Sequence, residues 1–144
     1  MNNCNVSFKA RATGPSLHLL VKLNSNIVFD AELIEQQEYN IIHEFEDIDG
    51  VKNLLSIEMT GKTVDHTKVS ADGNIIADRV IEISDMAIDN IELGIMFQEF
   101  STYEHDYNGT ADAILDQFFG IIGCNGTIRL EFESPVYQWL LENM

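Results

Sequence analysis

Basic residues are scarce in this 144-residue sequence, which has 8 Lys and Arg against 24 Asp and Glu and a formal net charge of −16. Proteins that bind nucleic acids neutralise phosphates with clustered lysine and arginine, and anionic membrane surfaces attract the same residues. We therefore expect neither nucleic acid nor membrane as a partner. Hydrophobic residues make up 45% of the chain, so the shortage of bases does not indicate disorder.

Long apolar runs and a signal peptide are also lacking. The first residues are polar, without the basic and apolar regions of a leader. The longest apolar run, Phe118–Cys124, is broken by two glycines and is far shorter than the ~18 residues that a membrane helix needs. We predict one soluble globular domain spanning residues 1–144.

Cysteine is rare as well. Cys4 and Cys124 show neither metal-ligand spacing nor a redox C-x-x-C pattern. Two buried thiols are favoured over a disulfide, and the sequence leaves their pairing open.

Alternation of apolar and polar residues is the dominant pattern, and it is typical of half-buried strands. It predicts about nine short strands separated by turn residues. An Asp72-Gly73 turn joins two of them, Thr67–Ala71 and Asn74–Asp78, into a hairpin. The other predicted strands are Val6–Ala12, Leu17–Leu23, Ile27–Phe29, Tyr39–Glu46, Leu55–Met59, Val80–Ile83, Ile91–Phe97 and Ile128–Phe132.

Helical signals are few. Thr110–Phe119 is a candidate short helix with Thr110 as its N-cap, and Ser134-Pro135 is typical of the start of a C-terminal helical turn. The chain is therefore predicted to be all-β: an antiparallel, jelly-roll-like β-sandwich with one or two short helices, including the C-terminal turn.

Catalytic motifs are absent. There is no G-x-S-x-G elbow, no glycine-rich phosphate loop, and no histidine pair with zinc-binding spacing. A carboxylate pair always occurs among 24 acids, so the acids alone do not indicate a hydrolase. We expect a protein that is not an enzyme.

Calcium is the one cofactor that the sequence leaves open. Asp72-Gly73-Asn74 lacks the alternating ligands of an EF-hand and is better explained as a hairpin turn. A site assembled from separate loops would draw on Asp65, Asp89 and Asp106. Otherwise no cofactor is expected.

Two segments are candidates for binding. The first contains Tyr103, His105, Asp106, Tyr107 and Asn108, whose rings and polar groups suit a sugar-binding loop, a protein interface or an ordinary packed loop. The second is the apolar C-terminal segment with Tyr137, Trp139 and Leu140, which suits an interface with another protein or a second copy.

The acids are unevenly distributed. No Lys or Arg occurs between Lys22 and Lys52, whereas eight acids do: Asp30, Glu32, Glu35, Glu38, Glu44, Glu46, Asp47 and Asp49. A second base-free stretch lies between Arg79 and Arg129. These stretches predict one or two acidic surfaces.

Three segments resemble calcium-dependent xylan-binding carbohydrate-binding modules. They are the strand Leu55–Met59, the run Asp78–Ile83 and the strand–bend Met86–Ile91, in which Asn90 replaces the usual glycine. This resemblance implies a β-sandwich that recognises a polysaccharide with the help of calcium.

Two other motifs resemble small proteins of tailed phages, especially marine phages that infect cyanobacteria. They are T-K-V-x-x-D-G-N-I-x-A-D at Thr67–Asp78 and C-N-G-T-x-x-L-E-F-x-x-P-x-Y-x-W-L-L-E-N-M at Cys124–Met144. This resemblance implies a virion protein made in the host cytoplasm, such as a capsid decoration or a tail or fibre component, that contacts other virion proteins or itself. A calcium-assisted carbohydrate-binding module is the alternative function.

Overall fold

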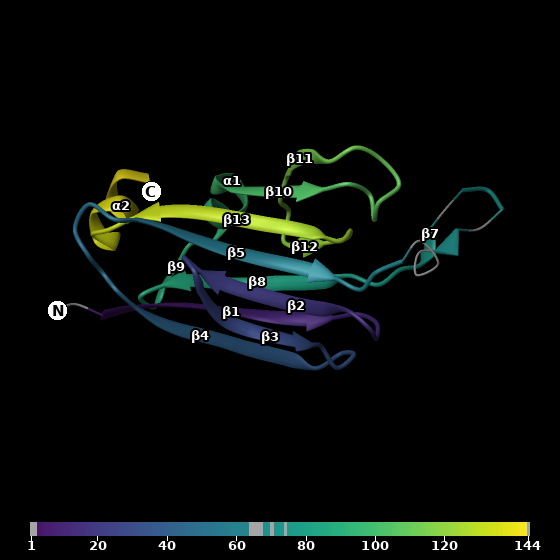
Figure 1. Ribbon diagram of the computed structural model, residues 1–144, viewed down its shortest axis with the longest axis horizontal. Coiled ribbons are helices and arrows are strands. Elements are labelled where there is room, and N and C mark those ends of the chain that lie inside the picture. Colours follow the sequence, from purple (N-terminus) through teal and green to yellow (C-terminus); the bar gives the residue numbers. More distant parts are fainter. Residues whose placement is uncertain (1–2, 64–67, 70, 74, 144) are drawn as a thin grey trace.

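The computed structural model describes residues 3–63, 68–69, 71–73 and 75–143, which fold into two facing antiparallel sheets (Figure 1). The five-stranded sheet has the order β12 (Ile121–Ile122), β8 (Ile81–Ile88), β1 (Asn3–Ala12) and β4 (Glu38–Glu46), with β9 (Ile91–Glu92) paired to β8. The six-stranded sheet has the order β11 (Ile114–Gln117), β10 (Ser101–His105), β13 (Gly126–Glu133), β5 (Lys52–Thr60), β2 (His18–Leu23) and β3 (Asn26–Glu32).

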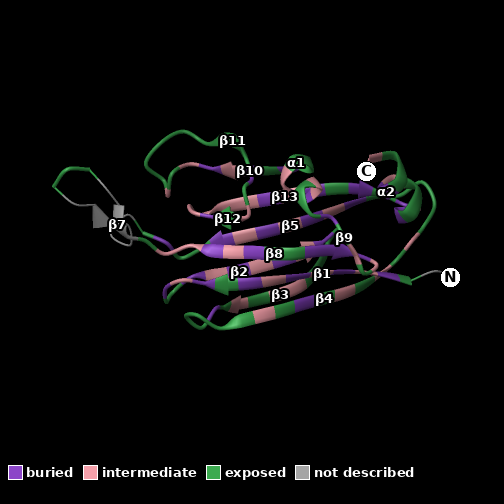
Figure 2. Ribbon diagram, turned by 180° about the vertical axis from the view of Figure 1, so that it is seen from behind, coloured by how far each residue is buried: buried purple, intermediate pink, exposed green. Residues whose placement is uncertain are grey.

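The core lies between the sheets because each central strand alternates in polarity. In β1 the side chains of Cys4, Val6 and Phe8 are buried, whereas Asn5 and Ser7 are partly exposed. Figure 2 shows the same alternation along the central strands. The predicted antiparallel β-sandwich with short helices, one of them C-terminal, is confirmed.

The hairpin of β6 (Lys68–Val69) and β7 (Ile75–Ala77) extends beyond one end of the sandwich (Figure 1). It agrees with the hairpin predicted around Asp72-Gly73, where Gly73 has a φ of 88°. Part of this predicted hairpin lies outside the described residues.

The prediction of a strand over Ile91–Phe97 is wrong in its second half. Gly94 adopts φ 56° and ψ −131°, which ends β9, and α1 (Ile95–Phe100) follows. Leu93 and Phe97 are buried while Ile95 is exposed, so burial recurs after four residues rather than two. Phe97 packs edge-on against Phe118, with ring centroids 5.0 Å apart.

The prediction of a helix over Thr110–Phe119 is also wrong. Strand β11 occupies Ile114–Gln117 and pairs antiparallel with β10, placing Ile114 opposite His105. Thr110 does not cap a helix, because its hydroxyl donates to the carbonyl of Tyr107, 2.7 Å away, within the β10–β11 turn. Pairing with β10 thus overrides the local helical signal.

The C-terminal helix α2 (Val136–Asn143) is present as predicted, with a different cap. The Val136 amide donates to the carboxylate of Asp47, with N···O distances of 3.1 and 3.4 Å. Ser134 instead receives a hydrogen bond on its hydroxyl from Asn53 at 3.0 Å. An aspartate from the β4–β5 loop therefore stabilises this helix start.

Gly126 is required where β13 approaches β10. A Cβ at this position would overlap the carbonyl oxygen of Glu104 and lie 2.9 Å from the Cβ of His105. We expect Gly126→Ala to lower the free energy of unfolding by about 1–3 kcal/mol, because the two strands must separate. The matched control is Gly123→Ala, since a Cβ at Gly123 has no neighbour within 4 Å. Urea denaturation measures both, and equal stability of the two variants would contradict the prediction.

Candidate functional site

The predicted binding segment lies at the end of the sandwich where β10 meets the start of β13. Tyr103 and His105 are buried side chains of β10, and Tyr107 follows in the turn with 46% of its surface exposed. The ring of His105 lies between the two tyrosines, with centroid distances of 4.6 and 4.7 Å. Of these three rings, Tyr107 alone presents a substantial surface to solvent.

The hydroxyl of Tyr103 makes hydrogen bonds to the backbone of the protein itself. It donates to the carbonyl of Cys124 and accepts from the Cys124 amide at 2.8 Å. Burial raises the pKa of this hydroxyl to about 12, so it stays protonated at neutral pH. His105 is held in turn by the carboxylate of Asp116, 3.4 Å from its Nε2.

The polar groups of Asp106 and Asn108 are also engaged within the loop. Asp106 accepts from the Gly109 amide at 2.8 Å, and Asn108 accepts from the Asn125 amide at 2.8 Å. Hydrogen bonds to the backbone hold these side chains in turn conformations. One oxygen of each side chain is thus used within the loop, and the ring of Tyr107 is its most exposed aromatic surface.

A buried lysine joins the loops at the same end. The side chain of Lys62 is 1% exposed, and its Nζ lies 2.6 Å from the carboxylate of Asp78 and donates to the carbonyl of Gly123. The Asn125 side chain accepts from the Lys62 amide at 3.0 Å and donates to the Lys62 carbonyl at 2.6 Å. Lys62 thereby links the segments before and after the β6–β7 hairpin to the turn before β13.

The predicted C-terminal interface is divided between core and surface. Leu140 is 2% exposed and belongs to the core, so it is not available to a partner. Tyr137 is exposed, Trp139 is partly buried, and Leu141 is exposed to 79%. The helical repeat explains the correction: Val136 and Leu140 face inward together.

Asp89 lies beside this helix, at the other end of the sandwich from Asp106. Its carboxylate accepts from the hydroxyl of Tyr137 and raises the pKa of that hydroxyl. Nearby, Cys4 is a free thiol whose pKa rises to about 11 through burial and the charges of Asp47 and Asp89. Cys124 is free too.

The described residues contain no cluster of acidic side chains for calcium. Among residues 3–63, 68–69, 71–73 and 75–143, no three His, Cys, Asp or Glu side chains are close enough to hold a metal ion. Asp89 and Asp106 lie at opposite ends of β13, and Asp65 falls outside the described residues. We therefore derive no role for calcium here.

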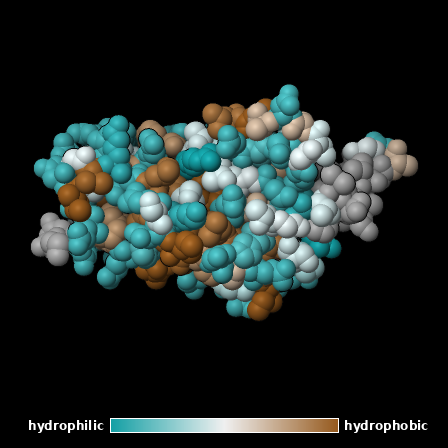
Figure 3. All heavy atoms as spheres, in the orientation of Figure 1, coloured by the Kyte–Doolittle hydropathy of each residue, from teal (hydrophilic) through white to brown (hydrophobic). Residues whose placement is uncertain are grey.

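Sequence reasoning missed a groove between the edge strands β3 and β4. It has a volume of about 550 Å³ and lies where β4, the β2–β3 turn and the start of β5 meet. The residues that line this groove, called the amide groove below, are Asn3, Asn24, Asn26, His43, Glu44, Phe45, Glu46, Ile48, Val51 and Asn53. Figure 3 shows apolar groups bordered by polar ones over this lower part of the molecule.

Asparagine side chains form the polar lining of the amide groove. Asn53 is 2% exposed; it donates to Ser134 and receives a hydrogen bond from Asn24, whose Nδ2 is 3.4 Å from its Oδ1. Asn24 is fixed in turn because its Oδ1 accepts from the Leu54 amide at 2.9 Å. These hydrogen bonds hold Asn24 and Asn53 in the wall of the groove and use their amides within the protein.

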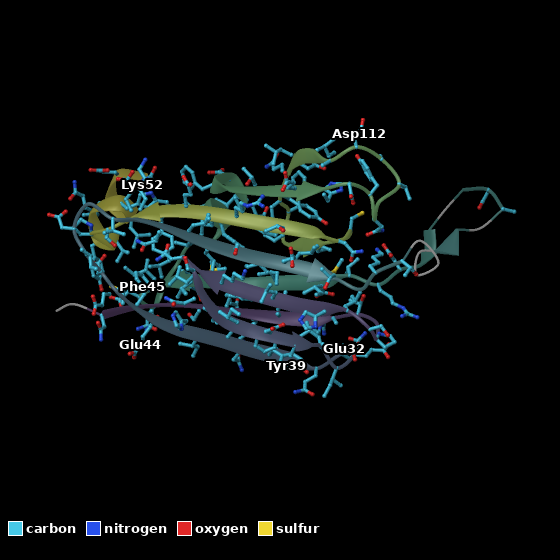
Figure 4. The ribbon with its side chains drawn as sticks, in the orientation of Figure 1. Glu32, Tyr39, Glu44, Phe45, Lys52 and Asp112 are labelled. Carbon is cyan, nitrogen blue, oxygen red and sulfur yellow. The ribbon has the colours of Figure 1, made fainter. Side chains whose placement is uncertain are left out.

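Phe45 supplies an aromatic wall. Figure 4 shows Phe45 and Glu44 on opposite sides of β4, as strand alternation requires. The Phe45 ring meets buried Phe132 edge-on at a centroid distance of 5.6 Å, and Phe132 contacts Trp139 at 6.1 Å. The wall is therefore anchored in the core rather than in a loop.

One signal could have revealed the amide groove. Asn53 is in phase with Leu55, Ile57 and Met59, so the alternation places a polar residue at an inward position. A buried asparagine needs hydrogen-bond partners and therefore marks a polar part of the interior.

The described residues show no assembled nucleophile. His18 pairs with Asp30 at 2.5 Å and His105 with Asp116 at 3.4 Å. In this part of the chain, no hydrogen bond links either histidine to a serine, threonine or cysteine side chain that it could activate. The described helices are both too short to cross a membrane.

No family model matches the sequence, and no curated protein matches it significantly. Among solved structures, the fold is similar to vCBM60 in complex with galactobiose, with a TM-score of 0.50 and 12% identity over 88% of this chain and 96% of that one. A selenomethionine form of vCBM60, from work on two families of calcium-dependent carbohydrate-binding modules, has a TM-score of 0.49 and 9% identity over 88% and 89% of the chains.

The first of these similarities shows the fold: a β-sandwich of the kind found in a carbohydrate-binding module. At 12% identity it transfers no residue of a binding site. The site must therefore be argued from the side chains of this chain.

Proposed function

We propose that this protein is a non-catalytic carbohydrate-binding domain that holds a glycan in the amide groove. The observation that carries the proposal is the combination of polar side chains and an aromatic wall in one groove, Asn26 and His43 beside Phe45. Ligand sites typically combine apolar walls with a few placed polar groups. The vCBM60 structure with galactobiose supports the proposal at the level of the fold.

The chemistry of the groove suits a sugar ring. The apolar face of a pyranose can pack on the Phe45 ring while its hydroxyls exchange hydrogen bonds with Asn26 and His43. Asn26 and His43 line the same groove, and no side-chain hydrogen bond within the described part of the chain engages either of them. They are therefore available to ligand hydroxyls.

This function corresponds to the alternative drawn from the sequence rather than to the virion protein. No comparison bears on a virion role, which stays a prediction. The loop of Tyr103 to Asn108 is the secondary candidate site, limited to the exposed ring of Tyr107.

Affinity electrophoresis and calorimetry with soluble galactan, glucan, mannan and xylan test the proposal. We expect at least one of these neutral polymers to bind. Titrations with calcium and with a chelator show whether the ion takes part. No binding by any polymer under either condition would overturn the proposal.

Two groove variants give the site a sharper test. Asn26→Ala and His43→Ala should each weaken binding about fivefold, since each removes one hydrogen bond worth about 1 kcal/mol. Neither residue belongs to the core, so the melting temperature should change little. The matched control is Asn40→Ala, on the opposite face of β4 from His43, with unchanged affinity. A control that weakens binding as much as the groove variants would locate the glycan elsewhere.

A further inference from the structure

Strand β11 forms an open edge of the six-stranded sheet. It pairs with β10 on one side, and no strand within the described part of the chain pairs with its other side. All four of its residues are exposed, and Figure 2 shows this strand as exposed at the margin of the sheet. Leu115 alone is 69% exposed. The N–H and C=O groups along such an edge can pair with another extended strand.

This edge is less protected by charge than the opposite side of the sandwich. Natural proteins commonly block edge strands with charged side chains. On the opposite side, the edge strands β3 and β4 contain five acids: Asp30, Glu32, Glu38, Glu44 and Glu46. Strand β11 contains one acid, Asp116, whose carboxylate lies 3.4 Å from the Nε2 of His105 and so points back toward β10. The edge of β11 is therefore the one suited to pairing.

The side chains beside Leu115 present little net charge to a second copy. Leu115 lies opposite Glu104 of β10, and the Glu104 carboxylate is 3.1 Å from a guanidinium nitrogen of Arg129. This ion pair neutralises the acid that borders Leu115. The net charge of −16 thus repels a second copy mainly from a distance, and salt screens that repulsion.

We propose that two copies of this protein pair β11 with β11 in antiparallel orientation, about a two-fold axis that passes through Leu115. An antiparallel edge is self-complementary under such an axis, so the same strand supplies both sides of the interface. In this register Leu115 contacts Leu115 of the partner subunit, and Ile114 lies opposite Asp116 of the partner subunit. The inference is independent of the proposed function.

The acids of this segment select the register. An axis through Asp116 would place two copies of this carboxylate opposite each other. An axis through Ile114 would place Asp116 opposite Asp112 of the partner subunit. Like charges directly opposite each other destabilise paired strands, so the axis through Leu115 is favoured. The edge is short, and the dimer is therefore expected to be weak.

Sedimentation equilibrium of the full chain measures this association, at protein concentrations from about 5 to 500 µM in about 0.15 and 0.5 M NaCl. We expect a reversible dimer that is stronger at the higher salt concentration. Leu115→Lys should weaken it about tenfold or more, because it removes the apolar contact and opposes two like charges. The matched control is Ile42→Lys, which makes the same change in charge at a side chain of β4 that is 66% exposed, and it should dimerise as wild type does. Circular dichroism verifies that both variants are folded.

Cysteine substitutions test the register directly. Residues directly opposite each other in antiparallel strands have Cβ atoms about 4.5–5.5 Å apart, close to the range of a disulfide. Leu115→Cys should therefore form an intermolecular disulfide with oxidised glutathione as the oxidant. Gln117→Cys lies on the same face, but four residues along the strand, or about 13 Å, separate it from its counterpart. It should cross-link no more than wild type, which contains the same two native cysteines.

Three outcomes would overturn the inference. The first is a chain that stays monomeric over the whole concentration range in both salt conditions. The second is an equal effect of Leu115→Lys and Ile42→Lys on dimerisation, which would place the interface elsewhere. The third is equal cross-linking of the two cysteine variants, which would exclude this register. None of these results bears on carbohydrate binding, which is measured separately.

Discussion

Replacing Phe132 by alanine is expected to lower the free energy of unfolding by about 3–5 kcal/mol, the usual cost of truncating a buried phenylalanine. Phe132 is 1% exposed near the C-terminal end of β13, between Phe45 of the five-stranded sheet and Trp139 of α2. Its loss would leave a cavity where both sheets and the C-terminal helix meet. Domains are stable by only about 5–15 kcal/mol, so about a fifth or more of the stability is at risk.

Urea denaturation followed by circular dichroism measures this effect. Phe119→Ala is the matched control, because Phe119 is exposed and should change the stability by no more than about 0.5 kcal/mol. A Phe132→Ala variant as stable as this control would show that the contacts around β13 do not stabilise the fold.

Asp78→Asn is expected to cost about 3 kcal/mol, because it leaves the ammonium of Lys62 buried without its counter-charge. Adding Lys62→Met should recover at least half of this loss, since the double variant removes the buried charge and keeps the aliphatic stem. The two substitutions are therefore expected to be strongly non-additive.

The exposed pair Arg11–Glu82, with an N···O distance of 3.0 Å, provides the control cycle. Solvent-exposed pairs contribute only about 0–1 kcal/mol, so its single and double variants should differ little. Additive losses at Lys62 and Asp78 in the same denaturation experiment would contradict the coupling of the buried ammonium to this partly exposed carboxylate.

The central strands could be predicted from the sequence because their side chains must alternate between core and solvent. Strands β1, β2, β5 and β13 contain this pattern almost without interruption. The segments around α1 and β11 could not be predicted in this way, because long-range contacts determine their secondary structure. Phe97 is buried against Phe118, and Ile114–Gln117 pairs with β10 although all four of its residues are exposed.

The candidate site was harder to predict than the fold. Tyr103 and His105 have side chains typical of a sugar site, yet the alternation along β10 turns both side chains toward the core. The amide groove draws on Asn24, Phe45 and Asn53, which come from three separate segments in two sheets. Only the packing of the sheets brings these residues together, and the inward position of Asn53 is the one sign of them along the chain.

The ring contacts behind Phe45 connect the groove wall to an intrinsic fluorophore. Trp139 is the only tryptophan of the chain, and its indole touches Phe132, which touches Phe45 in the groove wall. The indole also contacts Phe100 at a centroid distance of 5.9 Å, so aromatic rings surround it on two sides. Indole emission follows the polarity and packing of such surroundings. Movement of the groove wall on ligand entry can thus be followed by intrinsic fluorescence in the unlabelled protein.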